Sequence, residues 1–233
     1  MKPKKKEKRV FYTEFAYVCA IAILALGTAF MERADFGMSM VVAPAYLLHL
    51  KISQYLPWYS FGVSEYVLQA FLLLVLCTVM KRFSRGYLFS FVTAVLYGTA
   101  LDGCILIVSA LPLGSMPGRI VYYLVGMLLC AVGVAFFFKA YISPEAYELF
   151  VRELARKEQR DIGSVKTIYD CCSCLLAVAL SFAFFGFGHF EGVGLGTIVC
   201  ALINGRIIGL ISNKMDAQFD FADAFPLRKV FEK

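Results

Sequence analysis

The decapeptide ALGTAFMERA at residues 25–34 has a counterpart, AVGVAFFFKA, at residues 131–140. The two blocks share Gly, Ala and Phe in the same places, and each ends in a cation followed by Ala. Each block closes an apolar run long enough to cross a bilayer, whose core of about 30 Å needs about 20 residues of helix. The blocks therefore predict two copies of one membrane unit.

Further matches extend the similarity through both halves of the chain. They are Ala45-Tyr46 with Ala146-Tyr147, Gly62 with Gly163, and residues 90–98 with residues 197–205. Each half contains three apolar runs, so the second half enters the membrane from the opposite side. We expect an all-α polytopic membrane protein whose six transmembrane helices form two inverted three-helix repeats. The alternative is an old duplication of a helical unit without any transport function.

The six expected helices cover most of the chain. They are residues 12–31, 64–80, 87–111, 120–141, 165–186 and 195–212. The composition, 60% hydrophobic and 17% charged with a mean hydropathy of +0.72, excludes an ordinary soluble enzyme. Continuous apolar runs without a period of two disfavour a β-barrel. We divide the chain into a basic tail (1–11), a first repeat (12–112), a second, inverted repeat (119–213) and a C-terminal tail (214–233).

Two shorter segments are candidates for half-helices. Residues 36–50, FGMSMVVAPAYLLHL, are too short to span the membrane and too apolar for a solvated loop, so we expect a re-entrant or interfacial half-helix. In the second half, Ser143 is the expected N-cap of a helix with Pro144 at its first position. We expect this second segment to lie at the cytoplasmic face with its apolar side inward.

The positive charges alternate between rich and poor connections. Lys and Arg gather at residues 2–9, 81–85 and 152–166 and after residue 212, while the intervening connections carry only Arg33, Lys51 and Arg119. By the positive-inside rule both termini are cytoplasmic. The net charge of +6 predicts contact with anionic lipid headgroups rather than nucleic-acid binding.

Three motifs resemble the bacterial YitT/YczE group of integral membrane proteins. They are ADFGMSM at residues 34–40, GVGLGTIV at 192–199 and GRIIG at 205–209, and the resemblance spans most of the chain. It implies a multi-pass plasma-membrane protein and no established substrate. In that group Pro follows the Ser of the first motif; here Met40 takes its place, whereas Ser143-Pro144 keeps the pair.

Ionisable residues inside the expected helices cost a few kcal/mol each, so they should face a cavity or a partner. Asp102 is a candidate coupling-ion or proton site, with a structural carboxylate or a polar loop as the alternative. Asp170 and Arg206 lie at comparable depth and are expected to form a salt bridge. That pair is either a gate in a transport cycle or a static structural contact.

A cation also lies at the C-terminal end of the first helix of each half. Arg33 and Lys139 end these helices on opposite sides of the membrane, and Ser39 and Ser143 follow closely. A cation beside an exposed helix N-terminus favours an anion such as a carboxylate or phosphate. Snorkelling of both cations to lipid headgroups is the alternative.

Glu65 and Gln69 lie one turn apart on one face of the second helix. The repeat places Gln69 near the equivalent of Asp170. We expect a substrate site between the repeats. Its expected residues are Arg33, Ser39, Lys139, Ser143, Glu65, Gln69 and Asn204, with Asp102, Asp170 and Arg206 in coupling or gating.

Other chemistries have weaker signals. The eight Cys fall almost entirely within apolar runs, where Cys acts as a small hydrophobe. Cys171 and Cys174 have the C-x-x-C spacing of thiol oxidoreductases, but they lie in a reducing compartment, which favours simple packing. His49 and His189 are far apart in sequence, so no metal site is expected, and neither catalytic residues nor a cofactor are expected.

These observations favour a membrane transporter or facilitator, not an enzyme, for a small polar solute bound near the bilayer midplane. An anion and a zwitterion are the solutes considered. The first alternative is a non-catalytic scaffold or regulatory protein. A membrane thiol oxidoreductase is the second alternative, with less support. The expected partners are the solute and the lipid bilayer, not nucleic acid, and a homodimer is left open.

Overall fold

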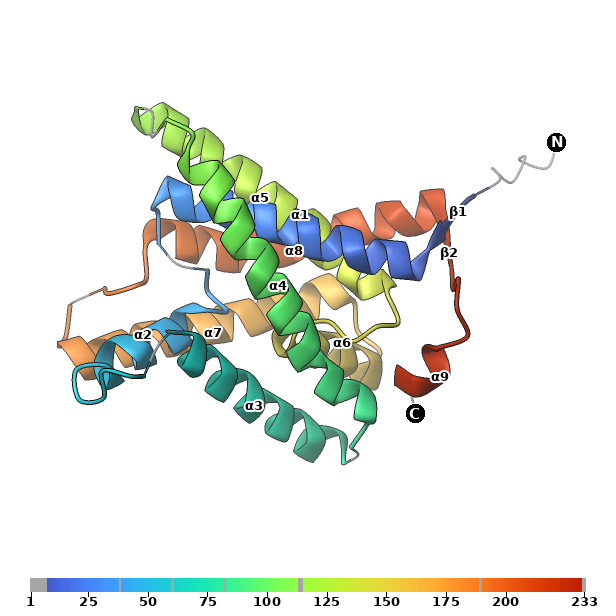
Figure 1. The fold of residues 1–233 in the computed structure, drawn as a ribbon, viewed down its shortest axis with the longest axis horizontal. Coiled ribbons are helices and arrows are strands. Elements are labelled where there is room, and N and C mark those ends of the chain that lie inside the picture. Colours follow the sequence, from blue (N-terminus) through green and yellow to red (C-terminus); the bar gives the residue numbers. More distant parts are fainter. Residues whose placement is uncertain are drawn as a thin grey trace.

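The structure is a computed structural model that describes residues 8–37, 39–59, 61–81, 83–112, 115–188 and 190–231. Figure 1 shows the order of the elements. They are β1 (Arg9–Tyr12), α1 (Thr13–Ala34), α2 (Ala43–Ile52), α3 (Phe61–Met80), α4 (Arg85–Ser109), α5 (Met116–Lys139), α6 (Ala146–Glu158), α7 (Ile162–Phe185), α8 (Leu195–Gln218), β2 (Phe219–Ala222) and α9 (Arg228–Phe231). Residues 1–7 of the expected basic tail lie outside the described residues, and so does His189, for which no role as a metal ligand is expected.

Six helices are long and apolar enough to cross a membrane: α1, α3, α4, α5, α7 and α8. The prediction of an all-α, polytopic membrane protein is therefore confirmed. The expected helix ends differ most at α8, which continues to Gln218 instead of ending at residue 212. Its last six residues, NKMDAQ, include polar residues that are compatible with a helix. The end of the apolar run therefore does not end the helix.

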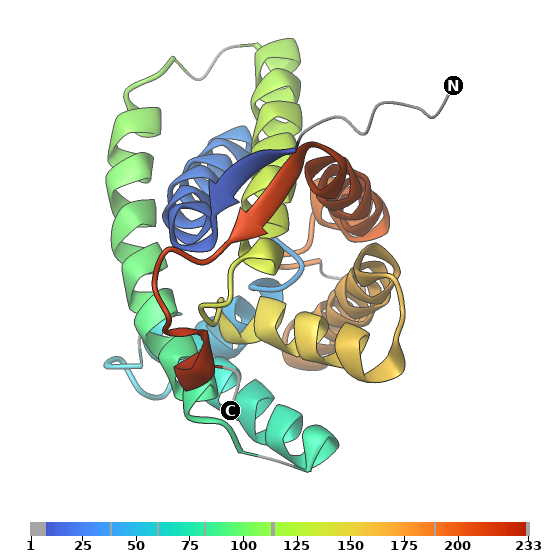
Figure 2. The ribbon, with the colours of Figure 1, turned by 90° about the vertical axis from the view of Figure 1, so that its right-hand side faces the viewer.

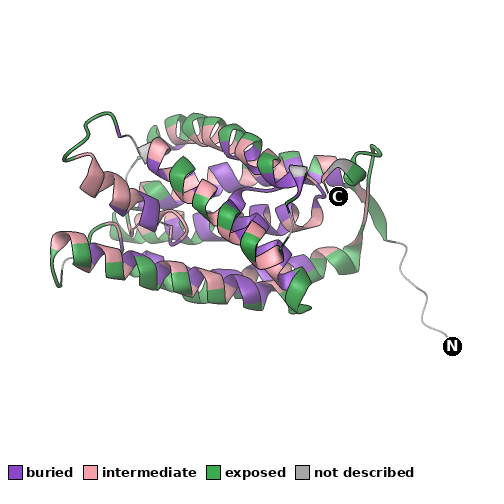
Figure 3. Ribbon diagram, turned by 90° about the horizontal axis from the view of Figure 1, so that it is seen from below, coloured by how far each residue is buried: buried purple, intermediate pink, exposed green. Residues whose placement is uncertain are grey.

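The long helices run alternately between two ends of the bundle (Figure 1). We call the end that carries β1 and β2 the strand end, and the opposite end, where α2 lies, the α2 end. The helices α1, α4 and α7 run from the strand end to the α2 end, whereas α3, α5 and α8 run back. The short helix α6 lies toward the strand end. Figure 3 shows buried faces turned inward and exposed faces on the outside of the bundle.

The most extensive contact is between the antiparallel helices α1 and α5. Small residues let their backbones approach closely. A Cβ atom added to Gly126 would lie 2.7 Å from the carbonyl oxygen of Gly27, and one added to Gly27 would lie 2.7 Å from the backbone nitrogen of Cys130. Larger buried residues around this contact, including Leu24 and Phe137, complete the main apolar core.

A parallel pair of strands joins the two ends of the described chain, as Figure 2 shows from the strand end. Arg9 lies opposite Phe219, and Phe11 stacks on Phe136 of α5 with ring centroids 5.5 Å apart. The Glu14 carboxylate accepts hydrogen bonds from the backbone amides of Ala224 and Phe225 at 3.0 and 2.9 Å. This sheet is not predictable from the sequence, because two separate four-residue strands carry too little pattern.

The expected start of the second half-helix is wrong. α6 begins at Ala146 with Glu145 as its N-cap, not at Pro144 with Ser143 as its N-cap. The hydroxyl of Thr93 donates to the Ser143 carbonyl at 2.7 Å, and the residue before a proline avoids helical geometry. The chain therefore becomes helical two residues later than expected.

The inward face of α6 also differs from the expected apolar one. Glu148, Arg152 and Glu153 are all 4–5% exposed, alongside fully buried apolar residues such as Leu149. The charged residues of α6 are buried because α6 is surrounded by four other helices, α3, α4, α5 and α7. The first half-helix, expected at residues 36–50, forms only from Ala43 to Ile52 and packs against α3 and α7.

The contact between α1 and α5 can be tested with a matched pair of glycine substitutions. Gly126→Ala should lower the apparent Tm in detergent by the equivalent of about 1–3 kcal/mol, because its Cβ meets backbone atoms that cannot move away easily. Gly98→Ala on α4, whose added Cβ would have no atom within 4 Å, should leave the Tm unchanged or raise it. Equal Tm values for the two variants would contradict the close packing.

Candidate functional site

A lysine and an aspartate are fully buried on α7. The side chains of Lys166 and Asp170 are 1% and 0% exposed, and Lys166 Nζ lies 2.9 Å from Asp170 Oδ1. Lys166 Nζ also lies 3.4 Å from Oε1 of Glu148 on α6. The ammonium group is 5.5 Å from the ring centroid of Tyr169, in a cation–π arrangement. Three buried charges and an aromatic ring thus meet between α6 and α7.

A third carboxylate, which is partly buried, approaches from α3. Tyr147 of α6 donates a hydrogen bond to Glu65 Oε2 at 2.6 Å, and the Gln69 amide donates another to the same carboxylate. Gln69 is only 4% exposed. The start of α6 therefore lies between the polar residues of α3 and those of α7.

Glu145, at the N-cap of α6, is the fourth carboxylate and is buried, with 6% exposure. Burial raises its pKa well above the ordinary value of 4.5, and the nearby carboxylates of Glu148 and Glu65 raise it further. The ammonium group of Lys166 acts in the opposite direction but does not cancel these effects. Burial and the neighbouring carboxylates therefore favour the protonated form of Glu145.

These side chains form one group, which we call the central cluster. It consists of Glu65, Gln69, Glu145, Glu148, Lys166 and Asp170. If every group were ionised, it would hold four carboxylates and one ammonium group. Burial of such a surplus of negative charge is costly without protons or a bound cation.

Several oxygens of the central cluster lack a hydrogen-bond partner among the described residues. They are Glu65 Oε1, Gln69 Oε1, Glu148 Oε2 and Asp170 Oδ2. All four oxygens are hydrogen-bond acceptors, given the orientation of the Gln69 amide. In each of these side chains another polar atom is held by a contact within the central cluster. The arrangement is suited to a ligand that carries N–H or O–H donors.

A separate charged group on α6 is balanced and anchors the helix. Arg152 Nη1 donates to the carbonyls of Ala140 and Ile142 at 3.0 and 3.3 Å, and Tyr87 donates to Glu153 at 3.2 Å. Arg152 also lies 4.0 Å from Glu153. These contacts tie the end of α5 and the start of α4 to α6.

The structure brings together three of the residues expected from sequence, Glu65, Gln69 and Asp170. The expected salt bridge between Asp170 and Arg206 is wrong, because Asp170 pairs with Lys166 one turn earlier on its own helix and Arg206 is exposed on α8. Asn204 is 5% exposed on α8, and its Oδ1 has no hydrogen-bond partner among the described residues.

The other expected residues lie away from the central cluster. Asp102 is exposed on α4, within its helix and not in a loop. Arg33 lies in the last turn of α1, which ends at the α2 end (Figure 1), and donates to the Leu111 carbonyl at 2.7 Å. Ser39 lies between α1 and α2. Lys139 pairs with Asp216 at 2.6 Å at the strand end.

Ser143 is buried near the strand end and does not cap α6. The expected anion-binding role of Arg33, Ser39, Lys139 and Ser143 stays a prediction. The two cations lie at opposite ends of the bundle, so a single solute cannot contact both at once.

Sequence reasoning missed Glu145, Glu148 and Lys166. Lys166 was counted with the basic connection before the fifth long helix, although its distance of four residues from Asp170 repeats the spacing of Glu65 and Gln69. Glu145 and Glu148 belong to the segment for which the sequence predicts a position at the cytoplasmic face with its apolar side inward. Comparison of the two four-residue spacings would have identified Lys166.

All eight cysteines are free, and Cys130, Cys174 and Cys200 lie in the main core. Cys171 donates a hydrogen bond to the Ala201 carbonyl at 3.6 Å. The thiol oxidoreductase hypothesis for Cys171 and Cys174 stays untested. Among the described residues no group of three His, Cys, Asp or Glu is placed to hold a metal ion.

Removal of the buried ammonium group should be strongly destabilising. Lys166→Met leaves Glu148 and Asp170 without their counter-charge, at an expected cost of about 3–5 kcal/mol. Lys214→Met, at an exposed position of α8, should change stability by less than about 0.5 kcal/mol. Thermal unfolding of both variants in detergent measures the difference, and comparable Tm values would contradict a buried ion pair.

The raised pKa of Glu145 predicts a pH dependence. The folded state keeps a proton that the unfolded chain releases above the ordinary pKa of 4.5, so this contribution to stability is complete below that pH and is lost as pH rises through the folded-state pKa. The Tm of the native protein should therefore fall between pH 5 and pH 8. Glu145→Gln should flatten this slope, whereas Glu158→Gln, at an exposed position of α6, should keep it.

The comparisons with known proteins place the chain in a family without an assigned activity. The family model described as "Family of unknown function (DUF6198)" matches residues 11–213, so the chain belongs to this family. No curated protein and no solved structure matches the chain. The narrower resemblance to the YitT/YczE group stays a prediction.

Proposed function

We propose that this member of the DUF6198 family is a membrane transporter of a small organic cation, and not an enzyme. The observation that carries the proposal is the central cluster, which holds four carboxylates, three of them buried, and only one ammonium group, and in which four oxygens lack partners among the described residues. The sequence left an anion or a zwitterion open as the solute. The charge of the central cluster disfavours a purely anionic solute, because it would meet a surplus of carboxylates.

The packing of the helices supports two inverted repeats as the framework. If α1 to α4 correspond to α5 to α8, the contact of α1 with α4 corresponds to that of α5 with α8, and the contact of α2 with α7 to that of α3 with α6. Corresponding helices also run in opposite directions between the two ends (Figure 1). Inverted repeats that contain short or interrupted helices are the architecture of many secondary transporters.

The central cluster lies at equivalent places of the two proposed repeats. Glu65 and Lys166 are 101 residues apart (166 − 65), and so are Gln69 and Asp170 (170 − 69). Tyr147, which binds Glu65, stands 101 residues after Tyr46. A site built from equivalent residues lies near the pseudo-two-fold axis, where both halves can reach it as they rock against each other.

The chemistry of the central cluster favours an ammonium group as the part of the solute that it binds. Lys166 already shows how an ammonium group is held here, by carboxylates at 2.9 and 3.4 Å and by the ring of Tyr169. The oxygens without partners on Glu65 and Gln69 offer a similar environment on the α3 side. Carboxylates together with aromatic rings are common recognition elements for amines.

We also propose that the strand end faces the cytoplasm of a bacterium. Most basic residues outside the central cluster lie at this end, including Lys8, Arg9, Lys157 and Arg160, whereas Arg33, Lys51 and Arg119 are at the other end. The positive-inside rule then gives cytoplasmic termini.

A ligand screen followed by a flux assay tests the function. Purified protein should gain thermal stability from amines such as ethanolamine, putrescine or choline, but not from acetate or phosphate, because a ligand that binds only the folded state raises its Tm. The stabilising amine should then enter liposomes that contain the protein. Glu148→Gln should reduce the initial rate at least tenfold, and Glu158→Gln on the exposed part of the same helix should not.

Three outcomes would contradict the proposal. Stabilisation by anions alone would contradict a cationic solute. Equal loss of flux in the Glu148→Gln and Glu158→Gln variants would contradict binding at the central cluster. Binding without flux in the native protein would favour the scaffold or regulatory alternative.

A further inference from the structure

The helices from α1 to α8 divide into two groups by their packing. α4, α1, α5 and α8 pack in a row, with the contact between α1 and α5 at its centre, and we call them the frame helices. α2, α3, α6 and α7 pack in a closed ring, and we call them the cluster helices, because every residue of the central cluster lies on them or caps one of them. Figure 1 shows the cluster helices in the lower part of the molecule and α1, α5 and α8 in the upper part.

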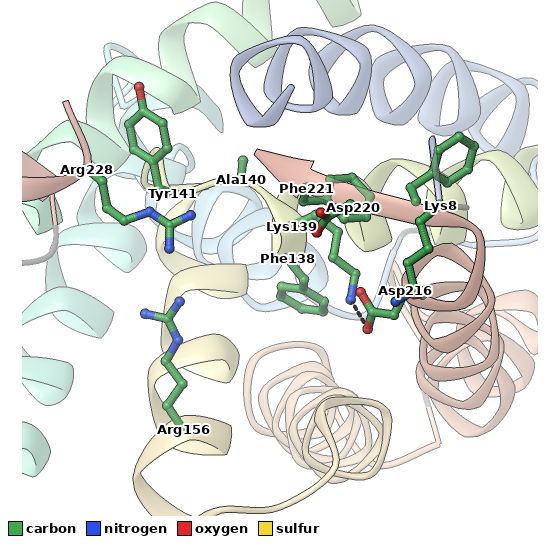
Figure 4. A pocket seen from close by; sticks show the side chains of 11 residues that line it. Lys8, Phe138, Lys139, Ala140, Tyr141, Arg156, Asp216, Asp220, Phe221 and Arg228 are labelled. Atoms are coloured by element: carbon green, nitrogen blue, oxygen red, sulfur yellow. Dashed lines mark hydrogen bonds and ion pairs between the residues drawn. The ribbon is translucent and has the colours of Figure 1, made fainter. Parts of the chain in front are cut away.

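Polar contacts tie the helices of each group together. The hydroxyls of Tyr17 and Thr93, which lie 2.7 Å apart, join α1 to α4. At the strand end Lys139 of α5 pairs with Asp216 of α8 at 2.6 Å (Figure 4). Within the cluster helices, the contacts of the central cluster join α3 to α6 and α6 to α7. Each group can therefore move as a unit against the other.

The largest contact between the two groups is that of α7 with α8. A Cβ atom added to Gly205 of α8 would lie 2.5 Å from the backbone nitrogen of Thr167, and one added to Gly163 of α7 would lie 2.8 Å from the Gly205 carbonyl oxygen. The groups also meet where Thr93 of α4 donates to the carbonyl of Ser143, just before α6. Because Gly163 lies in the first turn of α7, the closest packing between the groups is in the half of the bundle toward the strand end.

The counterpart of this contact in the first proposed repeat is not formed. In the sequence match of α4 with α8, Gly98 corresponds to Gly205, and α3 corresponds to α7. A Cβ atom added to Gly98 would have no atom within 4 Å, and α3 and α4 touch only marginally among the described residues. Ile208 is fully buried, whereas its counterpart Leu101 is partly exposed. From their connection at the strand end, α3 and α4 diverge toward the α2 end (Figure 1, Figure 2).

The central cluster shows the same difference between its two sides. Glu65 and Lys166 occupy equivalent places in the proposed repeats, but Glu65 is partly exposed and Lys166 is only 1% exposed. The α3 side of the central cluster is therefore the more accessible one. Accessibility follows the packing between the groups, because α3 is the cluster helix that lacks its counterpart contact.

Two equivalent contacts, one formed and the other open, are the arrangement of inverted repeats in one of two states, since an exchange of the conformations of the two halves gives the other state. We propose that the cluster helices turn against the frame helices, so that in a second state α3 packs on α4 at Gly98 and α7 separates from α8. This inference rests on the proposed transport function. With the strand end in the cytoplasm, the present structure is the state that faces the outside.

The connections between the two groups contain residues that can act as hinges. The chain passes between frame and cluster helices at the α1–α2, α3–α4, α5–α6 and α7–α8 connections. Hinges are a few loop residues that absorb changes of φ and ψ, and glycine adopts positive φ without steric cost. Residues with positive φ lie in three of these connections: Asp35, Gly37, Lys81, Gly186, Gly188 and Gly192.

A pair of glycine substitutions on α4 tests the second state. Gly98→Leu should keep the native Tm and its rise on amine binding, because its side chain meets no atom in the present state. Flux of ethanolamine, putrescine and choline into liposomes should fall at least about tenfold, because α3 can no longer pack on α4. Gly103→Leu is the matched control, since its counterpart on α8 is Leu210, which is 71% exposed, and it should transport at the native rate. Native flux in Gly98→Leu would overturn the inference.

A second measurement does not depend on the solute. The photo-cross-linker p-benzoylphenylalanine is placed in the full chain instead of Leu101, and cross-linked peptides from membranes are mapped by mass spectrometry. Because each photoreaction is irreversible, products of a minor state accumulate, and cross-links to α3 should exceed several-fold those formed when the probe replaces Leu106, which is 74% exposed on the same helix. Equal yields at the two positions would overturn the second state even in a protein that transports amines. Cross-links from position 101 in a protein that transports none of the three amines would support the two states and contradict the proposed solute.

Discussion

The burial of Lys166 between Glu148 and Asp170 is the constraint on which the arrangement of this bundle depends. An ammonium group inside a membrane protein persists only where carboxylates surround it, and here one of them comes from a different helix. That requirement fixes the start of α6 deep in the bundle, although six of its thirteen residues are charged. Once α6 lies there, Tyr147 and Glu145 are buried as well, and Glu65 of α3 receives its hydrogen-bond partner.

The polar interior needs a rigid framework, and the contact between α1 and α5 provides it. Glycines at Gly27 and Gly126 bring the two backbones together, and these helices have the highest buried share of the long helices, together with α8. By contrast, α4, α3 and α7 bury less of their surface and turn apolar side chains such as Leu106 outward. In the transport cycle that we propose, the moving helices are expected among these three, because they have fewer contacts to break.

The sequence allowed the six long helices to be predicted because a bilayer demands long apolar runs, and such runs are visible without tertiary information. It also identified Glu65, Gln69 and Asp170, because an ionisable or amide side chain within such a run needs a reason. The pairing of Asp170 could not be predicted in the same way. Arg206 and Lys166 both lie near it in depth, and only the rotation of α8, which turns Arg206 outward, decides between them.

The short elements were harder to predict, for a related reason. An amphipathic segment such as residues 143–158 has the same pattern whether its charged side meets water or a buried set of partners, and the partners of α6 come from distant parts of the chain. The strands β1 and β2 are more than 200 residues apart in sequence, and neither is stable without the other. Where partners of this kind decide the structure, local periodicity does not contain the answer.

The pairing of β1 with β2 has a consequence for how the protein is made. β1 precedes the first long helix and β2 follows the last one, so the sheet closes only after every membrane span has left the ribosome and been inserted. Until then Phe11 and the carboxylate of Glu14 remain without the partners that the C-terminal segment supplies. A chain with a missing or inverted span would therefore keep β1 and β2 apart and leave open strand edges, which can pair with other chains.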